Sequence, residues 1–242
     1  MNKEKAISQV NPVFNNGICH RGLHNEEFSE NGMKAFENAI NHDYAFELDI
    51  HLTRDNELVV FHDSDTMRMT GKEGIIEHMT FAEIRDNYRL PDGGVIPILK
   101  EVLDYTKERV PVVVELKVYE KNYKALAKRA LQELSCIVDK RNIIIISFDP
   151  RALWAFGKHG FVRQLLVAKS DEYTYFFRHF FEGVDLEYVF FKETRIQKYC
   201  KKHFANVWTI ETKDSMELVK DYVDTVTFQH LDPLYITNSL KG

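Results

Sequence analysis

Two runs of the sequence place carboxylates on the strand face opposite to the apolar residues. In FELDIHL, residues 46–52, Glu47 and Asp49 alternate with large apolar side chains. In VPVVVELKVY, residues 110–119, Glu115 and Lys117 alternate with apolar side chains in the same way. Carboxylates that share one site repel each other unless a cation compensates them. Because oxygen ligands suit hard divalent ions, the pattern indicates a site for Mg²⁺ or Ca²⁺. The alternative is a set of rim charges and ion pairs, such as Glu115 with Lys117.

Two histidines stand at the ends of apolar runs that have the composition of strands. His20 follows Ile18-Cys19 and is itself followed by Arg21 and Gly22, and His62 ends the run VVFHD at 59–63. Histidine is the side chain whose free pKa is best placed for acid–base work near neutrality. We therefore single out His20 and His62 as candidate acid–base groups. We interpret the other histidines, which lie in helical or loop contexts, as structural or surface residues.

The bulk composition excludes several classes of protein. The chain of 242 residues is 44% hydrophobic and 29% charged, with a net charge of −5, so it lacks the basic character of a nucleic-acid binder. Its three cysteines are widely spaced and odd in number, which fits a reducing compartment. The N-terminal stretch has no apolar core of a signal peptide, and no run of about 18 apolar residues exists. We expect a cytoplasmic protein with no stable membrane insertion and no nucleic-acid partner.

Strand-like runs alternate with helical patterns along the whole chain. The predicted strands are Gly17–His20, Tyr44–Leu52, Val110–Tyr119, Asn142–Phe148, Phe161–Ala168, Val184–Phe190, Asn206–Glu211 and Asp224–Phe228. The predicted helices include Asn31–Asn41, Tyr123–Val138 and a helix that opens at Asp149-Pro150 and closes at Gly160. This order predicts an α/β fold, a TIM (β/α)8 barrel in a single domain. The rival is an open doubly wound sheet, but the chain contains neither G-x-G-x-x-G nor a P-loop.

The predicted barrel has two irregular regions. A small insertion in the loop after the second strand, at about 53–109, contains a hairpin signal at Asp55-Asn56 and turn residues at 91–94. The chain ends fourteen residues after Phe228. We therefore expect the eighth helix to be short, missing or replaced by the N-terminal segment.

Seven short motifs, in order and at matching spacing over roughly the first half of the chain, resemble the glycerophosphodiester phosphodiesterases. They are HRG at 20–22, SENGMKAFENAI at 29–40, FELDI at 46–50, TRDNELVVFHD at 53–63, RMTG at 68–71, IPILKEVL at 96–103 and VELK at 114–117. Weaker matches are ISF at 146–148 and VWTIE at 207–211. The resemblance implies a TIM barrel with a small insertion after the second strand. It also implies hydrolysis of a glycerol phosphodiester with a divalent cation.

Carried over by position, the resemblance assigns a role to eight residues. It makes Glu47, Asp49 and Glu115 the metal ligands, His20 and His62 the acid–base pair, Arg21 and Lys117 phosphate contacts, and Trp208 a pocket wall. The family's P-E-N-T reads Ser29-Glu30-Asn31-Gly32 here, which bears on a helix start rather than on chemistry. Gln229 and His230 replace the family's pattern near the last strand, which leaves the pocket wall on that side open.

Several alternatives remain open from the sequence. A phospholipase C- or D-like barrel acting on a lipid phosphodiester would need an apolar rim, and YTYFFRHFF at 173–181 is the candidate segment. We interpret that segment as a helix that packs on the barrel. A non-catalytic barrel that binds glycerol phosphates would have no need of the complete acid–base and carboxylate set. The alcohol of the substrate, the nucleophile (water or a neighbouring hydroxyl), the choice of Mg²⁺ or Ca²⁺, the roles of the two histidines and the oligomeric state stay undetermined.

Overall fold

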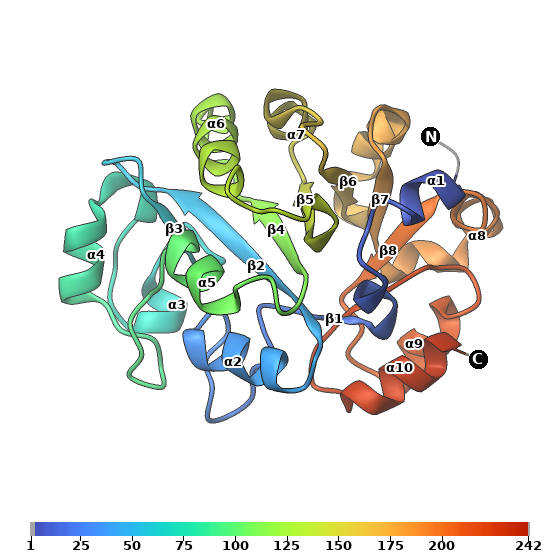
Figure 1. Ribbon diagram of the computed structural model, residues 1–242, viewed down its shortest axis with the longest axis horizontal. Coiled ribbons are helices and arrows are strands. Elements are labelled where there is room, and N and C mark those ends of the chain that lie inside the picture. The colour runs from blue at the N-terminus through green and yellow to red at the C-terminus, as the bar shows by residue number, and fades with distance from the viewer. Residues whose placement is uncertain (1–2, 242) are drawn as a thin grey trace.

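Eight parallel strands pair side by side around a common axis. The computed structural model describes residues 3–241. The strands are β1 (Ile18–Cys19), β2 (Ala45–Leu52), β4 (Val112–Leu116), β5 (Ile143–Ser147), β6 (Val162–Val167), β7 (Gly183–Glu187), β8 (Phe204–Trp208) and β9 (Thr227–Phe228). They follow the order β8-β7-β6-β5-β4-β2-β1-β9. A parallel bridge between Ile210 and Phe228 brings the β8 and β9 ends of this order together. The predicted TIM (β/α)8 barrel is therefore confirmed (Figure 1).

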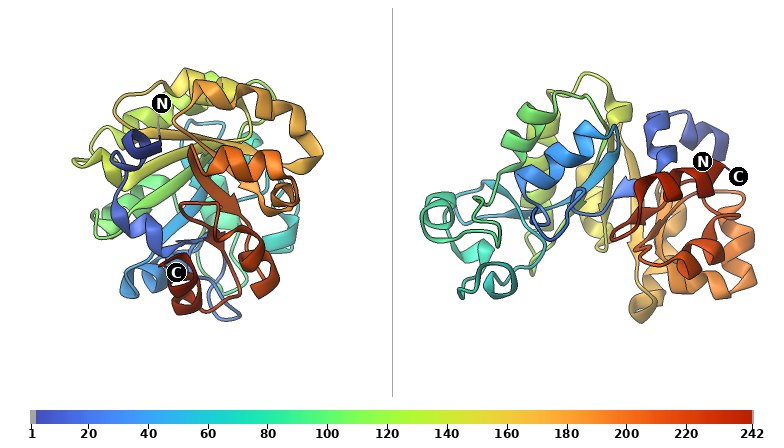
Figure 2. Two further views of the ribbon diagram at one scale, coloured as in Figure 1. Left: turned by 90° about the vertical axis from the view of Figure 1, so that its right-hand side faces the viewer. Right: turned by 90° about the horizontal axis from the view of Figure 1, so that it is seen from below.

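Helices surround the strands, as the end-on view in Figure 2 shows. They are α2 (Met33–Asn41), α5 (Leu99–Thr106), α6 (Tyr123–Leu134), α7 (Pro150–Phe156), α8 (Thr194–Cys200), α9 (Lys213–Val219) and α10 (Pro233–Lys241). The nine-residue α10 is the short eighth helix that the sequence allowed for. It packs next to the N-terminal segment, where Thr237 Oγ1 donates a hydrogen bond to the carbonyl of Asn16 at 2.9 Å.

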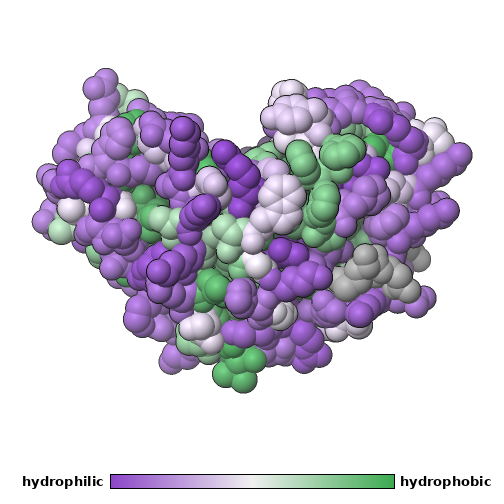
Figure 3. Space-filling model, turned by 90° about the horizontal axis from the view of Figure 1, so that it is seen from above, coloured by the Kyte–Doolittle hydropathy of each residue, from purple (hydrophilic) through white to green (hydrophobic). Residues whose placement is uncertain are grey.

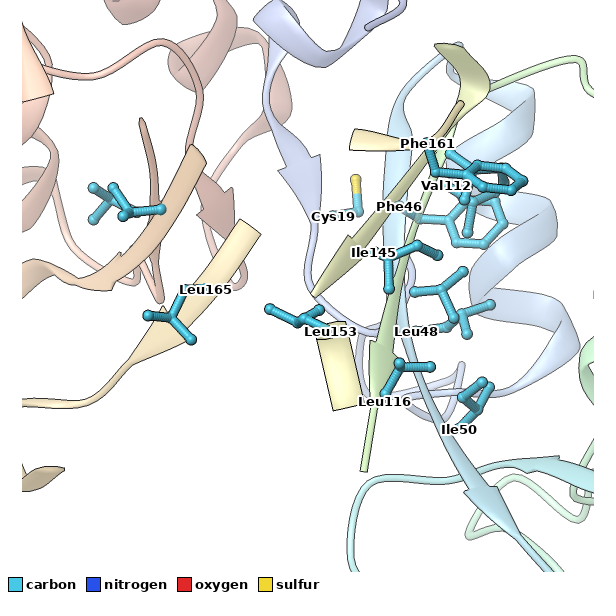
Figure 4. Packing of buried hydrophobic residues seen from close by; sticks show 14 of the residues in the cluster. Cys19, Phe46, Leu48, Ile50, Val112, Leu116, Ile145, Leu153, Phe161 and Leu165 are labelled. Atoms are coloured by element: carbon cyan, nitrogen blue, oxygen red, sulfur yellow. The ribbon is translucent and has the colours of Figure 1, made fainter. Parts of the chain in front are cut away.

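The two faces of each strand pack against different partners, as period-2 alternation requires. Phe46, Leu48 and Ile50 on β2 belong to the larger apolar cluster between the strands and the helices (Figure 4). Ala45 on β2 and Val113 on β4 belong to a second cluster inside the barrel. Each apolar face that the sequence singled out therefore faces the helix layer. The carboxylates that alternate with it face the barrel interior.

The N-terminal segment closes the end of the barrel where the strands begin. It contains α1 (Lys3–Ile7) and the 3-10 helix η1 (Pro12–Asn16). Ala6, Val10 and Phe14 pack in the interior cluster with Ile18, which begins β1. Burial of these apolar side chains stabilises the barrel at this end. The carboxyl ends of the strands are left as the open mouth.

The segment after β2 forms a small subregion at one end of the molecule (Figure 1). It contains β3 (Leu58–Val60), α3 (Met67–Thr70), the 3-10 helix η2 (Ile76–His78) and α4 (Phe81–Asn87). The predicted hairpin is present, because β3 pairs antiparallel with β2. Seven buried residues between 59 and 96 form an apolar cluster of their own. The following helix α5 instead packs into the main cluster, so it takes the place of the barrel's second helix.

Three predicted elements end earlier in the structure than in the prediction. The strand predicted at Val184–Phe190 ends at Glu187 and is followed by the 3-10 helix η5, Tyr188–Lys192. The helix predicted over Tyr123–Val138 ends at Leu134. The helix predicted to close at Gly160 ends at Phe156, because Gly157 with φ 70° already caps it.

The aromatic segment 173–181 is the largest correction. It lies in a 3-10 stretch, η4 (Lys169–Phe180), and not in an α-helix. Tyr175 and Phe181 pack into the main core, but Tyr173, Phe176 and Phe180 are exposed. The predicted packing on the barrel is therefore confirmed for Tyr175 and Phe181 and wrong for the three exposed rings, because the three residues of each 3-10 turn point to different sides.

Candidate active site

Three buried carboxylates meet inside the barrel at its open mouth. β2 and β4 pair in parallel with Asp49 opposite Glu115, and Glu47 lies two residues before Asp49 on the same face. Glu47, Asp49 and Glu115 each place a carboxylate oxygen within 4.8 Å of the others. All three side chains are buried. The register of two strands therefore produces the carboxylate cluster that the sequence predicted.

Two cations flank this cluster. Lys117 Nζ lies 2.9 Å from Glu115 Oε1 and 3.5 Å from Asp49 Oδ1. The backbone N–H of Arg21 donates to Glu47 Oε2 at 3.0 Å, and its Nε lies 3.5 Å from Asp49 Oδ2. The ion pair of Glu115 with Lys117 that we considered as an alternative is thus present. It does not complete the compensation, because three carboxylates and two cations leave one net negative charge.

The pKa values of the carboxylates report this shortage of positive charge. Burial raises the pKa of Glu115 to about 7, against the effect of Lys117. Burial, then the neighbouring charges of Asp49 and Glu115, also raises the pKa of Glu47. Burial also acts to raise the pKa of Asp49, but Lys117, His62 and Arg21 outweigh it and lower that pKa. A bound cation would relieve the repulsion between these oxygen atoms, so the donor set fits a divalent ion.

A sharp turn delivers His20 and Arg21 from the end of β1 to this site. Gly22 has φ +84°, and a Cβ there would lie 2.8 Å from the Cβ of Ala35. Only glycine fits this close approach and positive φ. The expected turn after Arg21 is therefore present.

Gln229 orients the His20 ring. His20 Nδ1 lies 2.6 Å from Gln229 Oε1. Because this amide oxygen only accepts hydrogen bonds, Nδ1 carries the proton and Nε2 of the neutral ring is left as the acceptor. Gln229 Nε2 in turn donates to Glu211. Burial, followed by the nearby Arg21, lowers the pKa of His20 to about 3.

A hydrogen bond followed by a chain of ion pairs positions His62 and ties the subregion after β2 to the barrel loops. His62 Nδ1 lies 2.6 Å from Asp63 Oδ1, and Asp63 Oδ2 accepts a bond of 2.6 Å from Arg68 Nε. Arg68 also donates to Glu30, which pairs with Arg21 at 2.8 Å. Burial lowers the pKa of His62, although Asp49 acts in the opposite direction. Both histidines therefore favour the neutral form.

Asn31 fixes the Asp49 carboxylate from behind. Its Nδ2 donates to Asp49 Oδ2 at 2.8 Å. Asn31 itself has φ 54°, a left-handed conformation that asparagine tolerates better than most residues. The run at 29–32 therefore contributes Glu30 and Asn31 as positioning residues.

Two connected cavities open at the mouth. The larger has a volume of about 730 Å³, and the smaller about 120 Å³. His62, Glu115 and Phe148 line both of them. Trp208 lines the smaller cavity from the end of β8, where its Nε1 donates to the Asp185 carbonyl at 3.2 Å. Its ring lies edge-on to Phe148, with the ring centroids 5.5 Å apart.

Sequence reasoning missed a buried polar group on the far side of the smaller cavity. Asp185 on β7 lines that cavity, and Asn206 Nδ2 donates to its Oδ2 at 2.8 Å. Asp185 Oδ1, Asn206 Oδ1 and both polar atoms of Gln164 are buried and have no hydrogen-bond partner among residues 3–241. Burial raises the pKa of Asp185 to about 8. The signal existed in GVDLE, where Asp185 interrupts an apolar run as Glu47 does in FELDI.

All eight predicted site residues meet at this mouth. His20, Arg21, Glu47, His62, Glu115 and Trp208 line the smaller cavity, and Lys117 and Asp49 join them through their ion pairs. The positioning groups Asp63, Arg68 and Gln229 were not predicted. Asp63 and Arg68 lie in the motifs 53–63 and 68–71, whose charged residues gave a usable signal.

In the part of the chain that the structure describes, no helix is long and apolar enough to span a bilayer.

Comparisons with known proteins identify the family of this chain. The protein-family model "Glycerophosphoryl diester phosphodiesterase family" matches residues 20–230. A glycerophosphodiester phosphodiesterase from Caldanaerobacter subterraneus is 27% identical over 93% of this chain and 97% of its own length. One from Bacillus altitudinis is 29% identical over 58% of this chain, and the match spans 61% of that relative.

Solved structures share the fold over nearly the whole chain. A glycerophosphodiester phosphodiesterase from Parabacteroides distasonis has a TM-score of 0.75 and 26% identity, covering 93% of this chain and 94% of that one. A phosphodiesterase from Oleispira antarctica, solved with the product sn-glycerol-3-phosphate, has a TM-score of 0.80 at 20% identity, covering 98% and 99%. The family match over residues 20–230 includes every predicted site residue. The chain thus belongs to the glycerophosphoryl diester phosphodiesterase family of enzymes.

Proposed function

We propose that this protein hydrolyses glycerophosphodiesters to glycerol 3-phosphate and an alcohol, and that the reaction depends on a divalent cation. The observation that carries the proposal is the buried cluster of Glu47, Asp49 and Glu115, placed between two neutral histidines. The product bound to the Oleispira antarctica relative supports glycerol 3-phosphate as the product here. Hydrolysis breaks the bond between phosphorus and the alcohol oxygen, which takes up a proton, while a water oxygen ends on phosphorus.

Glu47, Asp49 and Glu115 would hold the cation, for which their oxygen donors suit either Mg²⁺ or Ca²⁺. When bound, such an ion neutralises charge on a non-bridging phosphate oxygen. The charge balance supports this role. A divalent ion would turn the net charge of the carboxylate cluster and its two cations from −1 to +1, which matches a phosphodiester monoanion.

Arg21 and Lys117 would contact the phosphate. Arg21 Nε is buried and makes no hydrogen bond to any residue among 3–241. A phosphate oxygen would satisfy this donor, and guanidinium groups bind phosphate oxygens well. Lys117 Nζ lies near two carboxylates and would add a point charge. Both groups would stabilise the charge that grows on phosphate oxygens in the transition state.

His20 and His62 would move the two protons of the reaction. One takes a proton from the nucleophile, and the other gives one to the leaving alcohol oxygen. Gln229 holds His20 so that Nε2 is the reactive nitrogen, and Asp63 holds Nδ1 of His62 in the same way. A substrate with a nitrophenol leaving group needs no proton on that oxygen. Activity on it should survive replacement of the acid histidine by alanine and fall with replacement of the base.

The attacking oxygen is water or the glycerol hydroxyl next to the phosphate, which would form a cyclic phosphate first. A substrate that lacks this hydroxyl, turned over in ¹⁸O water, separates the two routes. Full turnover with one ¹⁸O in the phosphate product would exclude the internal route.

The test of the proposed function is release of glycerol 3-phosphate from glycerophosphoethanolamine. We expect release with Mg²⁺ or Ca²⁺, none with EDTA, and none from His20→Ala with either ion. Binding of glycerol 3-phosphate without any turnover would favour the non-catalytic barrel instead. We expect the reaction to occur in the cytoplasm on a small-molecule substrate, as the composition of the chain indicates.

A further inference from the structure

Four exposed aromatic rings and one half-buried ring, Phe177, form a surface beside the site. We call this surface, made of Trp154, Tyr173, Phe176, Phe177 and Phe180, the aromatic rim. Tyr173 is 75% exposed, Phe176 73%, Phe180 58% and Trp154 42%. Trp154 lies edge-on to Phe177 and to Phe180, with ring centroids 5.5 and 5.6 Å away. Large rings grouped on a surface mark a binding site more often than chance exposure does.

The aromatic rim is continuous with the candidate active site. The larger cavity is lined both by His62, Glu115 and Lys117 of the candidate site and by Trp154, Tyr173 and Phe177 of the aromatic rim. Val118, Phe148 and Pro150 add apolar atoms to the same lining. The space-filling view shows a hollowed face on which green and white, apolar or weakly polar, atoms gather (Figure 3). A substituent on a phosphate bound near Lys117 would therefore run along an apolar wall.

The two cavities differ in a way that separates the two substituents of a phosphodiester. The smaller cavity, about 120 Å³, is lined by Asp185, Thr209 and Thr227 beside His20. Its polar groups suit the hydroxyls of the three-carbon glycerol group. The larger cavity, about 730 Å³, exceeds what ethanolamine or a second glycerol would fill. The alcohol therefore belongs in the larger cavity.

The charges of the larger cavity limit the kind of alcohol. Glu120 and Asp171 line it and have no ion-pair partner among residues 3–241, whereas Asp149 is paired with Arg151 at 2.7 Å. An acidic group on the alcohol would be repelled by these carboxylates. A neutral or cationic alcohol would not be repelled by them.

We propose that the larger cavity and the aromatic rim bind the leaving alcohol, and that the preferred alcohol carries an unbranched apolar chain and no acidic group. The inference rests on the proposed function, since it names the substrate class of the same site. Each methylene that leaves water for the apolar wall contributes transition-state binding. The structure thus predicts an enzyme that favours amphiphilic glycerophosphodiesters over small hydrophilic ones.

The experiment is a homologous series. Glycerophospho-n-alkanols with two, four, six and eight carbons are given to the metal-loaded protein below their critical micelle concentrations, and kcat/KM is measured from glycerol 3-phosphate release. We expect kcat/KM to rise by about two- to fourfold per methylene up to roughly six carbons. In Trp154→Ala and Phe177→Ala this slope should flatten, so that the loss of kcat/KM relative to the wild type grows with the length of the alkyl chain.

A matched control and the contrary results complete the design. Val138→Ser also replaces an exposed apolar residue, 89% exposed, but lies outside the cavity and should keep the slope. A flat series, or variants that lower all chain lengths equally, would overturn the inference. A flat alkanol series together with rapid cleavage of lysophosphatidylethanolamine would also overturn it. The preferred substrate would then carry its apolar chain on the glycerol and not on the leaving alcohol.

Two further outcomes would also overturn the inference and can be told apart from those. Light scattering that shows a dimer lost in Phe176→Ser, with an unchanged slope, would make the aromatic rim an interface between copies of this chain. No release from any member of the series, with glycerophosphoethanolamine also intact, would contradict the proposed function itself.

Discussion

The two sides of the barrel mouth differ in how their polar groups are partnered. On the side of β1, β2 and β4, one hydrogen bond and three ion pairs connect a continuous chain of residues, namely His62, Asp63, Arg68, Glu30 and Arg21. On the side of β6, β7 and β8, Gln164, Asp185 and Asn206 have buried polar atoms with no hydrogen-bond partner among residues 3–241, and aromatic rings border the cavity.

This difference separates chemistry from substrate choice. Acid–base groups and phosphate contacts must be held in fixed places, so their side of the mouth is rigidly braced. The opposite side must accept a variable alcohol and the hydroxyls of glycerol. Asp185, which lines the smaller cavity and has a carboxylate oxygen with no hydrogen-bond partner among residues 3–241, is available to a ligand there. Mutations on the first side should therefore reduce kcat, and mutations on the second side should change KM and substrate preference.

The largest loss of kcat is expected when a member of the carboxylate cluster is replaced. Glu47→Gln keeps the side-chain volume and an acceptor for the Arg21 backbone N–H, but it removes a charge. We expect kcat to fall by at least about 10³-fold. Because burial raises the pKa of Glu47, removing its charge should not lower the melting temperature of the metal-free protein. A variant that unfolds, or one that keeps full activity, would contradict this role.

The second-largest loss of kcat is expected when either histidine of the acid–base pair is replaced. His20→Ala and His62→Ala are each expected to lower kcat by about 10²–10⁴-fold, with little change in KM. Steady-state kinetics on glycerophosphoethanolamine measures both constants. His159→Ala, a substitution of an exposed histidine far from these strands, is the control and should have no effect. A KM effect alone would show that the histidines only bind substrate.

A smaller effect is expected at Gln229, which orients His20 from the β9 side. Gln229→Leu removes the acceptor for Nδ1, and we expect kcat to fall by about 10–30-fold. Gln229→Glu should instead raise the pKa of His20, because a carboxylate favours the imidazolium. The limb of the pH profile that reports His20 should then move to higher pH. If both variants keep the wild-type profile, Gln229 does not orient the ring.

The buried carboxyl of Asp185 should make the stability of the fold depend on pH. Its pKa, about 8 in the folded protein against 3.8 in an exposed carboxyl, means that the folded state binds the proton more tightly. The free energy of unfolding should therefore fall as pH rises from about 4 to 8. Asp185→Asn should reduce this loss in urea titrations at several pH values. An identical pH dependence in the variant would show that Asp185 is ionised when folded.

The ion-pair chain should give the smallest effect. Arg68 is about half exposed, so its bonds to Glu30 and Asp63 are screened by water. We expect Arg68→Ala to lower kcat by only a few-fold, through looser placement of His62. Salt titration offers a check. High ionic strength should lower kcat of the wild type and leave kcat of the variant almost unchanged. A loss as large as that of His62→Ala would make Arg68 a direct contact to substrate.

The same contrast explains how much could be predicted from sequence. The catalytic side was predictable because inverted strand faces at 46–52 and 112–118 are local patterns, and a parallel register brings Asp49 opposite Glu115. The motifs of the family resemblance lie mostly in that half of the chain. The fold followed from the alternation of strands and helices, including the hairpin of β3 with β2.

The substrate side was harder because its features depend on tertiary packing. Nothing local to 173–181 distinguishes a packed helix from a 3-10 stretch with exposed rings, and burial decides between them only in the fold. The partnership of His20 with Gln229 joins residues 209 positions apart. Asp185 could have been noticed in GVDLE, where it lies between apolar residues. A single carboxylate within an apolar run, however, predicts no partner.

The most direct test of the central claim is a metal titration of activity. Protein stripped with EDTA and dialysed is supplied with increasing Mg²⁺ or Ca²⁺, and glycerol 3-phosphate release from glycerophosphoethanolamine is recorded beside Glu47→Gln. We predict no release without metal, saturable recovery in the wild type, and a recovery in the variant that is absent or needs far more metal. Release by the stripped wild type at an undiminished rate would contradict a role for the carboxylate cluster as a metal site.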